Sequence, residues 1–127
     1  MVAPIKMNTN VLAWMGDAVY EQYVRKHVVD TGQIHADKLH ISAVKYVKAS
    51  AQAHVMKTII SELPEEEEKL VKRANNKKFS TKAKNADPVE YKWATAFEAL
   101  IGYYYLSRNT EKLDEVLKKA VAIIENR

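Results

Sequence analysis

The stretch Ala94-Thr95-Ala96-Phe97-Glu98-Ala99-Leu100-Ile101-Gly102 decides the expected fold. At helical spacing its apolar residues cover nearly the whole circumference, and a helix that is apolar all round is buried in a protein interior. Glu98 is the only formally charged residue between Lys92 and Arg108. An ionised carboxylate in such a place is costly unless a cation, a metal ion or a hydrogen-bond donor meets it.

A second carboxylate lies in a similar setting, the stretch Leu12-Ala13-Trp14-Met15-Gly16-Asp17-Ala18-Val19-Tyr20. Asp17 has apolar neighbours on both sides, so we expect its helix to bury much of that turn. Gly16 adjoins Asp17 and Gly102 lies one helical turn after Glu98, although a glycine costs about 1 kcal/mol in a helix interior. A close approach of two helices explains both glycines, and it would bring Asp17 and Glu98 together where the helices cross.

Two such acids without an equally buried Lys or Arg suggest that they share a metal ion or one proton. Oxygen-only ligands favour Mg²⁺, or Mn²⁺, over zinc. Glu21, one turn after Asp17, could join as an outer metal ligand, or it could pair with Arg25. The pattern also permits a structural interpretation, in which Asp17 caps a helix end and Glu98 reaches the surface.

Helical periodicity continues along the rest of the chain, and we expect an all-α fold of five or six helices. Four glutamates, residues 65–68, fill the first turn of one helix, where carboxylates complement the helix dipole. Thr110 is the expected cap of the last helix. The expected helices are Leu12–Val29, a stretch from about Asp37 to Ser61 that breaks near His40–Ser42, one that starts at Pro64, one from Pro88 to about Ser107, and one after Thr110; Asn75–Asp87 is expected to be a loop.

Length and composition limit the class of protein. The 127 residues carry a net charge of +4, 47% hydrophobic residues and no Cys, which fits one domain over residues 1–127 and excludes a disulfide scaffold. The longest apolar run, Ala99–Leu106, is far below the ~20 residues that span a bilayer, and no signal peptide is recognisable. We therefore expect a cytoplasmic protein that makes no membrane contact.

The positive charge is concentrated in one segment. Between Glu68 and Asp87 there are seven basic residues and no acidic one. A basic segment with little apolar content suits contact with a phosphate backbone, and Phe79 could stack on the ligand or pack on the body. A solvated loop is the alternative, and a membrane surface is a weaker one because no basic amphipathic helix is present. The basic residues are Lys69, Lys72, Arg73, Lys77, Lys78, Lys82 and Lys84.

The two acidic stretches together resemble the catalytic domain of the ribonuclease III family. The pieces Gly16-Asp17-Ala18-Val19 and Glu98-Ala99-Leu100-Ile101-Gly102 are modest signals alone, but their order, their separation and the chain length match. Leu39-His40 and the segment that ends Ala83-Lys84-Asn85-Ala86 resemble Mini-ribonuclease III, the short bacterial branch made of the catalytic domain without an appended double-stranded-RNA-binding domain.

The resemblance implies a divalent-metal endonuclease that cleaves double-stranded RNA as a homodimer and leaves 5′-phosphate ends. Asp17 and Glu98 match the catalytic, metal-binding carboxylates of the family, and Trp14 matches an aromatic residue at the dimer interface. Without a separate RNA-binding domain, the basic segment would have to make the contacts that bind RNA. The residues expected to do so are Lys72, Arg73, Lys77, Lys78, Lys82 and Lys84. Other family members carry additional acids, at the positions of Asn10, Ala13 and Thr95 in this sequence. The implied substrate is the large-subunit (23S) ribosomal RNA precursor, and a ribosomal protein bound to it is an implied partner.

Two other classes of function remain open at this point. A non-catalytic double-stranded-RNA-binding module of the same fold would share the basic segment but not metal-dependent cleavage. A helical metal-carboxylate enzyme acting on small phosphorylated substrates would lack salt-dependent affinity for duplex RNA. The Tyr103-Tyr104-Tyr105 run could add to a dimer interface or be buried in the monomer.

Overall fold

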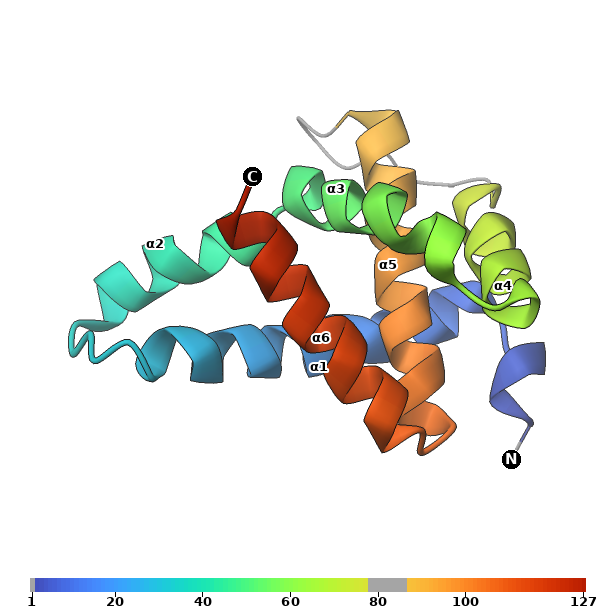
Figure 1. Ribbon diagram of the computed structural model, residues 1–127, viewed down its shortest axis with the longest axis horizontal. Coiled ribbons are helices and arrows are strands. Elements are labelled where there is room, and N and C mark those ends of the chain that lie inside the picture. Colours follow the sequence, from blue (N-terminus) through green and yellow to red (C-terminus); the bar gives the residue numbers. More distant parts are fainter. Residues whose placement is uncertain (1, 78–86) are drawn as a thin grey trace.

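The computed structural model describes residues 2–77 and 87–127, and all of the regular structure in those residues is helical. This confirms the all-α prediction. The longest helix, α1, and the long helix α5 cross, and α2 folds back along α1 as a hairpin that extends to one side (Figure 1). The elements are η1 (Pro4–Lys6), α1 (Thr9–Val29), α2 (Ala36–Val47), α3 (Ala49–Ile59), η2 (Ile60–Glu62), α4 (Glu65–Asn75), α5 (Pro88–Leu106) and α6 (Thr110–Glu125).

Side-chain caps set three of the helix starts. Asn8 accepts a hydrogen bond from the Asn10 N–H at 2.8 Å, and Asp87 accepts one from Val89 N–H at 2.8 Å, just before Pro88. The last helix is capped by Asn109, whose side chain accepts from the Lys112 N–H at 3.2 Å. The prediction of Thr110 as the cap was therefore wrong by one residue.

The predicted break near His40–Ser42 was also wrong, because the helix continues to Val47. Lys48 is extended, with ψ of 151°, and it ends α2 and begins α3. Gln52 donates from Nε2 to the carbonyl oxygen of Val47 at 2.8 Å and so satisfies the end of α2. Residues 40–42 contain no Gly or Pro that would interrupt a helix. The break at Lys48 therefore follows from the packing of the C-terminal end of α2.

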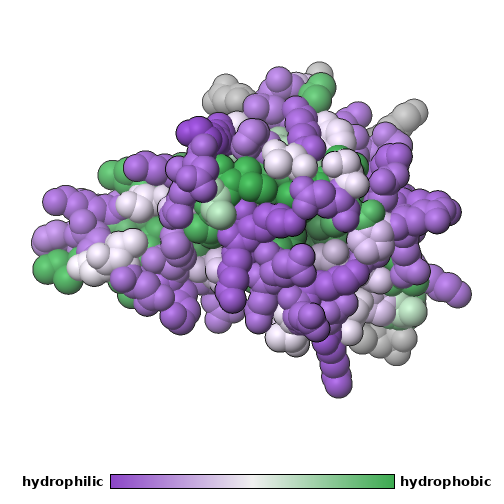
Figure 2. All heavy atoms as spheres, in the orientation of Figure 1, coloured by the Kyte–Doolittle hydropathy of each residue, from purple (hydrophilic) through white to green (hydrophobic). Residues whose placement is uncertain are grey.

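The core lies where α5 is surrounded by α1, α3 and α4. The most extensive helix contact is between α1 and α5. Tyr20 of α1 and Phe97 of α5, both fully buried, make an edge-to-face ring contact with centroids 5.0 Å apart. Polar side chains predominate on the face that carries α6, and apolar groups show mainly in a band across its middle (Figure 2). No helix in the described part of the chain is long and apolar enough to cross a membrane.

Candidate active site at the crossing of α1 and α5

Two glycines allow α1 and α5 to approach each other to backbone contact. A Cβ atom on Gly16 would lie 1.7 Å from the carbonyl oxygen of Glu98, and one on Gly102 would lie 1.9 Å from that of Leu12. Because each obstacle is backbone, no side-chain rotation can relieve it. The close helix approach expected from the glycine positions is confirmed.

Asp17 and Glu98 meet beside this contact. Burial raises the pKa of Glu98 to about 9, together with a hydrogen bond to Asp17 and the charge of Asp17. Glu98 is half-buried and Asp17 is exposed. The helix buries Gly16 and Tyr20 on either side of Asp17, so the expectation of burial holds for much of the turn but was wrong for Asp17 itself. Gly16 is the residue that faces α5, and the next residue along the helix therefore lies at the open edge of the contact.

Within residues 2–77 and 87–127, neither carboxylate forms an ion pair with a Lys or Arg. Glu21 contributes a further negative charge that raises the pKa of Glu98, but its carboxylate pairs with Arg25 at 3.0 Å. The described residues contain no group of three or more His, Cys, Asp or Glu side chains that could hold a metal ion. The site therefore consists of two adjacent carboxyl groups, which can share one proton or one cation.

The positions where other family members carry acids offer no further charge. Thr95 donates its hydroxyl to the carbonyl oxygen of Tyr91 at 2.9 Å, and Ala13 is buried. Asn10 is exposed one turn before Ala13 on the same helix. Among the described residues, Asp17 and Glu98 are therefore the two carboxyl groups that meet at this crossing, with the charge of Glu21 close enough to act on Glu98.

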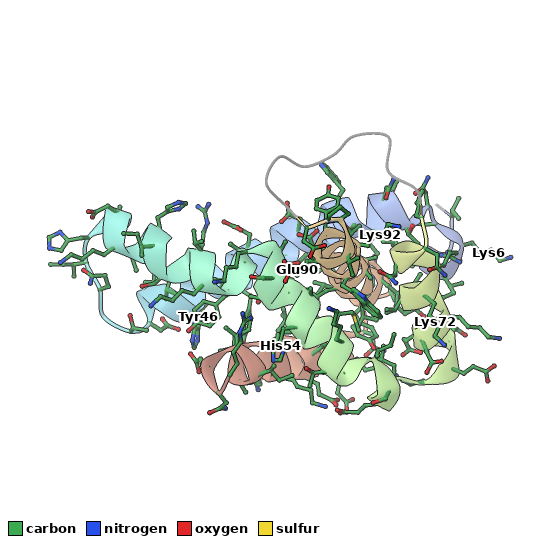
Figure 3. The ribbon with its side chains drawn as sticks, turned by 90° about the horizontal axis from the view of Figure 1, so that it is seen from above. Lys6, Tyr46, His54, Lys72, Glu90 and Lys92 are labelled. Atoms are coloured by element: carbon green, nitrogen blue, oxygen red, sulfur yellow. The ribbon has the colours of Figure 1, made fainter. Side chains whose placement is uncertain are left out.

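Half of the predicted RNA-binding residues are described, and they lie at the α4 end of the molecule, where Figure 3 labels Lys6 and Lys72. Arg73 donates to the carbonyl oxygens of Ile5 and Met7 at 3.2 and 3.3 Å, and Lys77 donates to Asn8. Lys72 pairs with Glu68 at 3.0 Å. An open hollow there is lined by Lys6, Met7, Asn8, Thr9, Arg73, Asn76 and Lys77. Lys78, Phe79, Lys82 and Lys84 lie outside the described residues.

The acidic run at the start of α4 is structural, as the dipole interpretation predicts. Glu65 and Glu68 pair with lysines one turn later. Glu67 is buried and forms an ion pair with Lys112 of α6 at 2.8 Å. The sequence pattern did not predict this contact between α4 and α6.

The comparisons with known proteins agree with this architecture. Residues 10–109 match the Ribonuclease III domain family, and the chain belongs to that family of endoribonucleases. Within the family it belongs with the Mini-ribonucleases 3. It is 48% identical to "Mini-ribonuclease 3" of Brevibacillus brevis over 96% of this chain and 91% of that one, and 41% identical to that of Streptococcus pneumoniae over 94% of each. A crystal structure of a Fusobacterium nucleatum protein superposes with a TM-score of 0.82 at 32% identity, covering 92% of this chain and 93% of that chain.

The raised pKa of Glu98 predicts how the stability of the metal-free protein depends on pH. The neutral carboxyl is favoured in the folded state, so this stabilisation is complete below pH about 4.5, the ordinary value, and is lost as pH rises through about 9. In EDTA at pH 8.5, Glu98→Gln should therefore unfold at a higher temperature than wild type. Its unfolding temperature should also fall less than that of wild type when the pH is raised from 6 to 8.5. One pKa unit corresponds to about 1.4 kcal/mol, so we expect a difference of about 2 kcal/mol or more, roughly 6 °C. Thermal unfolding followed by circular dichroism measures it.

The exposed Glu111 provides the control for this prediction. Glu111→Gln should follow the wild-type pH dependence. Parallel curves for wild type and Glu98→Gln would contradict the assignment of the raised pKa to Glu98.

Proposed function

We propose that Asp17 and Glu98 are the catalytic residues and together hold Mg²⁺, with Mn²⁺ as a substitute, for hydrolysis of double-stranded RNA. The observation that supports this most directly is the contact between the two carboxylates, one from each of two helices whose backbones touch. Two adjacent carboxyl groups without a Lys or Arg partner in the described residues share a proton when no metal is bound, and a divalent cation would replace that proton and stabilise both carboxylates.

The donor set suits magnesium in particular. Mg²⁺ prefers oxygen ligands and is commonly bound by one or two carboxylates, with water and substrate phosphates completing its coordination. The exposed Asp17 leaves the site open for those phosphates. When bound, the ion would activate water and neutralise charge on the phosphodiester, and cleavage would leave a 5′-phosphate. Glu21, held by Arg25, would act from the outer side of the site.

The basic residues would bind the duplex by its phosphates. Lys72, Arg73 and Lys77 lie at the α4 end of the molecule, and we propose that Lys78, Lys82 and Lys84 act with them. Arg73 and Lys77 also hold the chain before α1, so their substitution would affect the N-terminal segment as well as RNA binding. Binding of this kind reads the shape and backbone of A-form RNA, not its sequence.

The exposed face of α1 supports the proposal of a homodimer. Trp14 is 76% exposed and Val11 51% exposed, and they lie at i and i+3 on one face that continues to the exposed Ala18. A tryptophan left in water is typical of an interface rather than of a free surface. Tyr104, by contrast, is buried within the monomer, and Tyr103 donates to Glu66 at 3.1 Å, which leaves only Tyr105 of that run well exposed.

Trp14→Arg is expected to convert the dimer to a monomer. A charged side chain at the centre of an apolar interface would be buried without a partner, so the dissociation constant should rise about a hundred-fold or more. Sedimentation velocity at micromolar concentration measures the mass, and Arg25→Ala serves as an exposed control on the same helix. A wild-type mass of one chain at that concentration would contradict the dimer.

We propose the 23S ribosomal RNA precursor as the substrate, which would place the enzyme in the cytoplasm, with a ribosomal protein as a potential partner on that RNA. The name of the relatives, Mini-ribonuclease 3, supports RNA as the substrate class. An end-labelled RNA duplex of about 30 base pairs, incubated with Mg²⁺ or with EDTA, tests the basic activity. We expect cuts in both strands with Mg²⁺ and none with EDTA. Cleavage that persists in EDTA would contradict the metal site, and an intact duplex and an intact structured precursor in every lane would contradict the nuclease.

A further inference from the structure

The open hollow at the α4 end of the molecule is lined by three basic residues and, in the described part of the chain, by no acidic one. It lies between the segment that precedes α1 and the C-terminal end of α4, and its volume is about 690 Å³. Since a single water takes about 30 Å³, there is room for a phosphate group together with its water. The basic lining residues are Lys6, which Figure 3 labels at this end, Arg73 and Lys77, and we refer to this site as the basic hollow.

The positive charge of these three residues is not neutralised by any described carboxylate. Arg73 and Lys77 donate to neutral oxygens, which are two backbone carbonyls of the N-terminal segment and the side-chain amide of Asn8. Neither they nor Lys6 forms an ion pair with another described residue. The two lysines of α4 differ in this respect, because each pairs with a glutamate one turn earlier in the helix. Three cations without a carboxylate partner around one hollow favour an anionic ligand.

Arg73 holds the segment that carries Lys6. Its Nη2 donates to the carbonyl oxygens of Ile5 and Met7 at 3.2 and 3.3 Å, and these two residues flank Lys6. Lys6 also ends a 3₁₀ turn, which is closed by a hydrogen bond from the Met7 N–H to the Pro4 carbonyl oxygen at 3.1 Å. A guanidinium carries five N–H donors, so those on Nε and Nη1 remain for a ligand. The backbone at Lys6 is therefore held in place before a ligand binds, which lowers the entropy cost of binding.

The basic hollow lies close enough to the proposed active site for one duplex to contact both. Thr9, the first residue of α1, lines the hollow, and Asp17 lies eight residues further along the same helix. At 1.5 Å per residue, this separation is about 12 Å along the helix axis. Each strand of a duplex carries a phosphate roughly every 3 Å along its axis, so the hollow and Asp17 are separated by only a few nucleotides.

We infer that the basic hollow binds a phosphate group of the RNA duplex near the cleaved bond, with Lys6 as a contact residue and Arg73 as the residue that positions it. This inference rests on the proposed function as a nuclease for double-stranded RNA. It extends the predicted RNA-binding surface, which comprised residues 72–84, to the N-terminal segment. Recognition of this kind depends on the charge and shape of the backbone and not on base sequence.

Lys6→Gln is the direct test, because the side chain is exposed and its substitution should not disturb folding. Binding of a labelled RNA duplex of about 30 base pairs is measured by fluorescence anisotropy in EDTA over a range of salt concentrations. We expect the dissociation constant to rise about 10-fold, since a hydrogen bond to a charged group is lost. The slope of log affinity against log salt concentration should become shallower by about one for each chain that contacts the duplex.

Cleavage kinetics separate a binding role from a structural one. With Mg²⁺, the KM of Lys6→Gln for the duplex should rise in parallel with the dissociation constant, while kcat stays within a few-fold of wild type. Lys6→Arg keeps the positive charge and should bind the duplex with the affinity and salt dependence of wild type. If Lys6→Gln retains the wild-type affinity and salt slope, the inference is overturned.

Lys118→Gln is the matched control. Lys118 is exposed on α6, forms no ion pair with another described residue, and its substitution changes the net charge by the same amount. The variant should keep the wild-type affinity for the duplex and the wild-type salt slope. Equal losses in Lys6→Gln and Lys118→Gln would show a general effect of net charge and would overturn the inference.

Arg73→Lys tests the positioning role. It keeps the charge, but the shorter side chain does not reach the position of Nη2, from which both carbonyl oxygens are held. The loss of affinity should be at least as large as that of Lys6→Gln, and the double variant should bind little more weakly than Arg73→Lys alone. Fully additive losses would overturn the positioning role of Arg73.

The outcomes also distinguish this inference from the proposed function. If wild type shows no salt-dependent binding of the duplex and does not cleave it with Mg²⁺, the proposed function itself is wrong. If wild type binds and cleaves the duplex, while Lys6→Gln matches it in affinity and salt slope, only the assignment of the basic hollow is wrong.

Discussion

Glu98→Gln and Asp17→Asn are each expected to reduce cleavage of duplex RNA about a thousand-fold or more, while binding of the duplex in EDTA stays within a few-fold of wild type. Each substitution removes one of two negatively charged ligands at a site where the described residues supply no third. A thousand-fold loss corresponds to about 4 kcal/mol of transition-state stabilisation. Single-turnover cleavage of an end-labelled duplex measures the rate, and a gel shift in EDTA measures binding.

Glu21→Gln is the informative comparison for these two variants. Because the Glu21 carboxylate is paired with Arg25, we expect its loss to reduce cleavage less than ten-fold. A loss as large as that of Glu98→Gln would make Glu21 a direct ligand. Cleavage by Glu98→Gln within ten-fold of wild type would contradict the assignment of the active site.

Gly16→Ala and Gly102→Ala are expected to destabilise the protein severely. Each new methyl group would lie within 2 Å of a backbone carbonyl oxygen of the opposite helix, at 1.7 and 1.9 Å respectively. The helices must separate, at a cost of more than about 3 kcal/mol, which is a large part of the stability of a domain of this size. Urea denaturation followed by circular dichroism measures the loss.

The third glycine provides a matched control. Gly32 has a positive φ of 93°, but a Cβ atom there would meet nothing within 4 Å. Gly32→Ala should therefore cost only about 1–2 kcal/mol, from backbone strain. If Gly16→Ala were no more destabilising than Gly32→Ala, the close contact of α1 and α5 would not exist in solution. Any Gly16→Ala protein that folds should also have lost affinity for Mn²⁺, because Asp17 and Glu98 would be drawn apart.

The predicted elements and the structure agree best where a local signal is strong. Pro88 after Asp87 begins a helix as expected, because proline is tolerated in the first turn and aspartate caps it. The α2–α3 break was misplaced because it lies at Lys48, a residue without any intrinsic breaking tendency. Its position depends on the packing of both helices and on the Gln52 side chain, which periodicity does not show.

The candidate site shows the same division. The meeting of Asp17 and Glu98 was predicted from two features, a lone Glu in an apolar helix and two glycines beside the two acids. Each feature costs stability, the first by burying a carboxyl group and the second by placing glycine inside a helix, so each indicates a specific need at that position. The exposure of Asp17 was missed, because the side of a contact on which a residue lies depends on the partner helix. Lys6 was missed altogether, because a single lysine before the first long helix carries no signal until α4 brings Arg73 and Lys77 beside it.

By itself, the sequence determined the helical class, most of the helix starts, the pair of carboxylates and the family, because each depends on spacing or on residue types along the chain. The tertiary structure alone decided that α1 and α5 touch through backbone, that Arg73 holds the N-terminal segment, and that the buried Glu67 pairs with Lys112. These contacts join residues far apart in the chain. Their energies depend on distance and burial, and folding alone sets both.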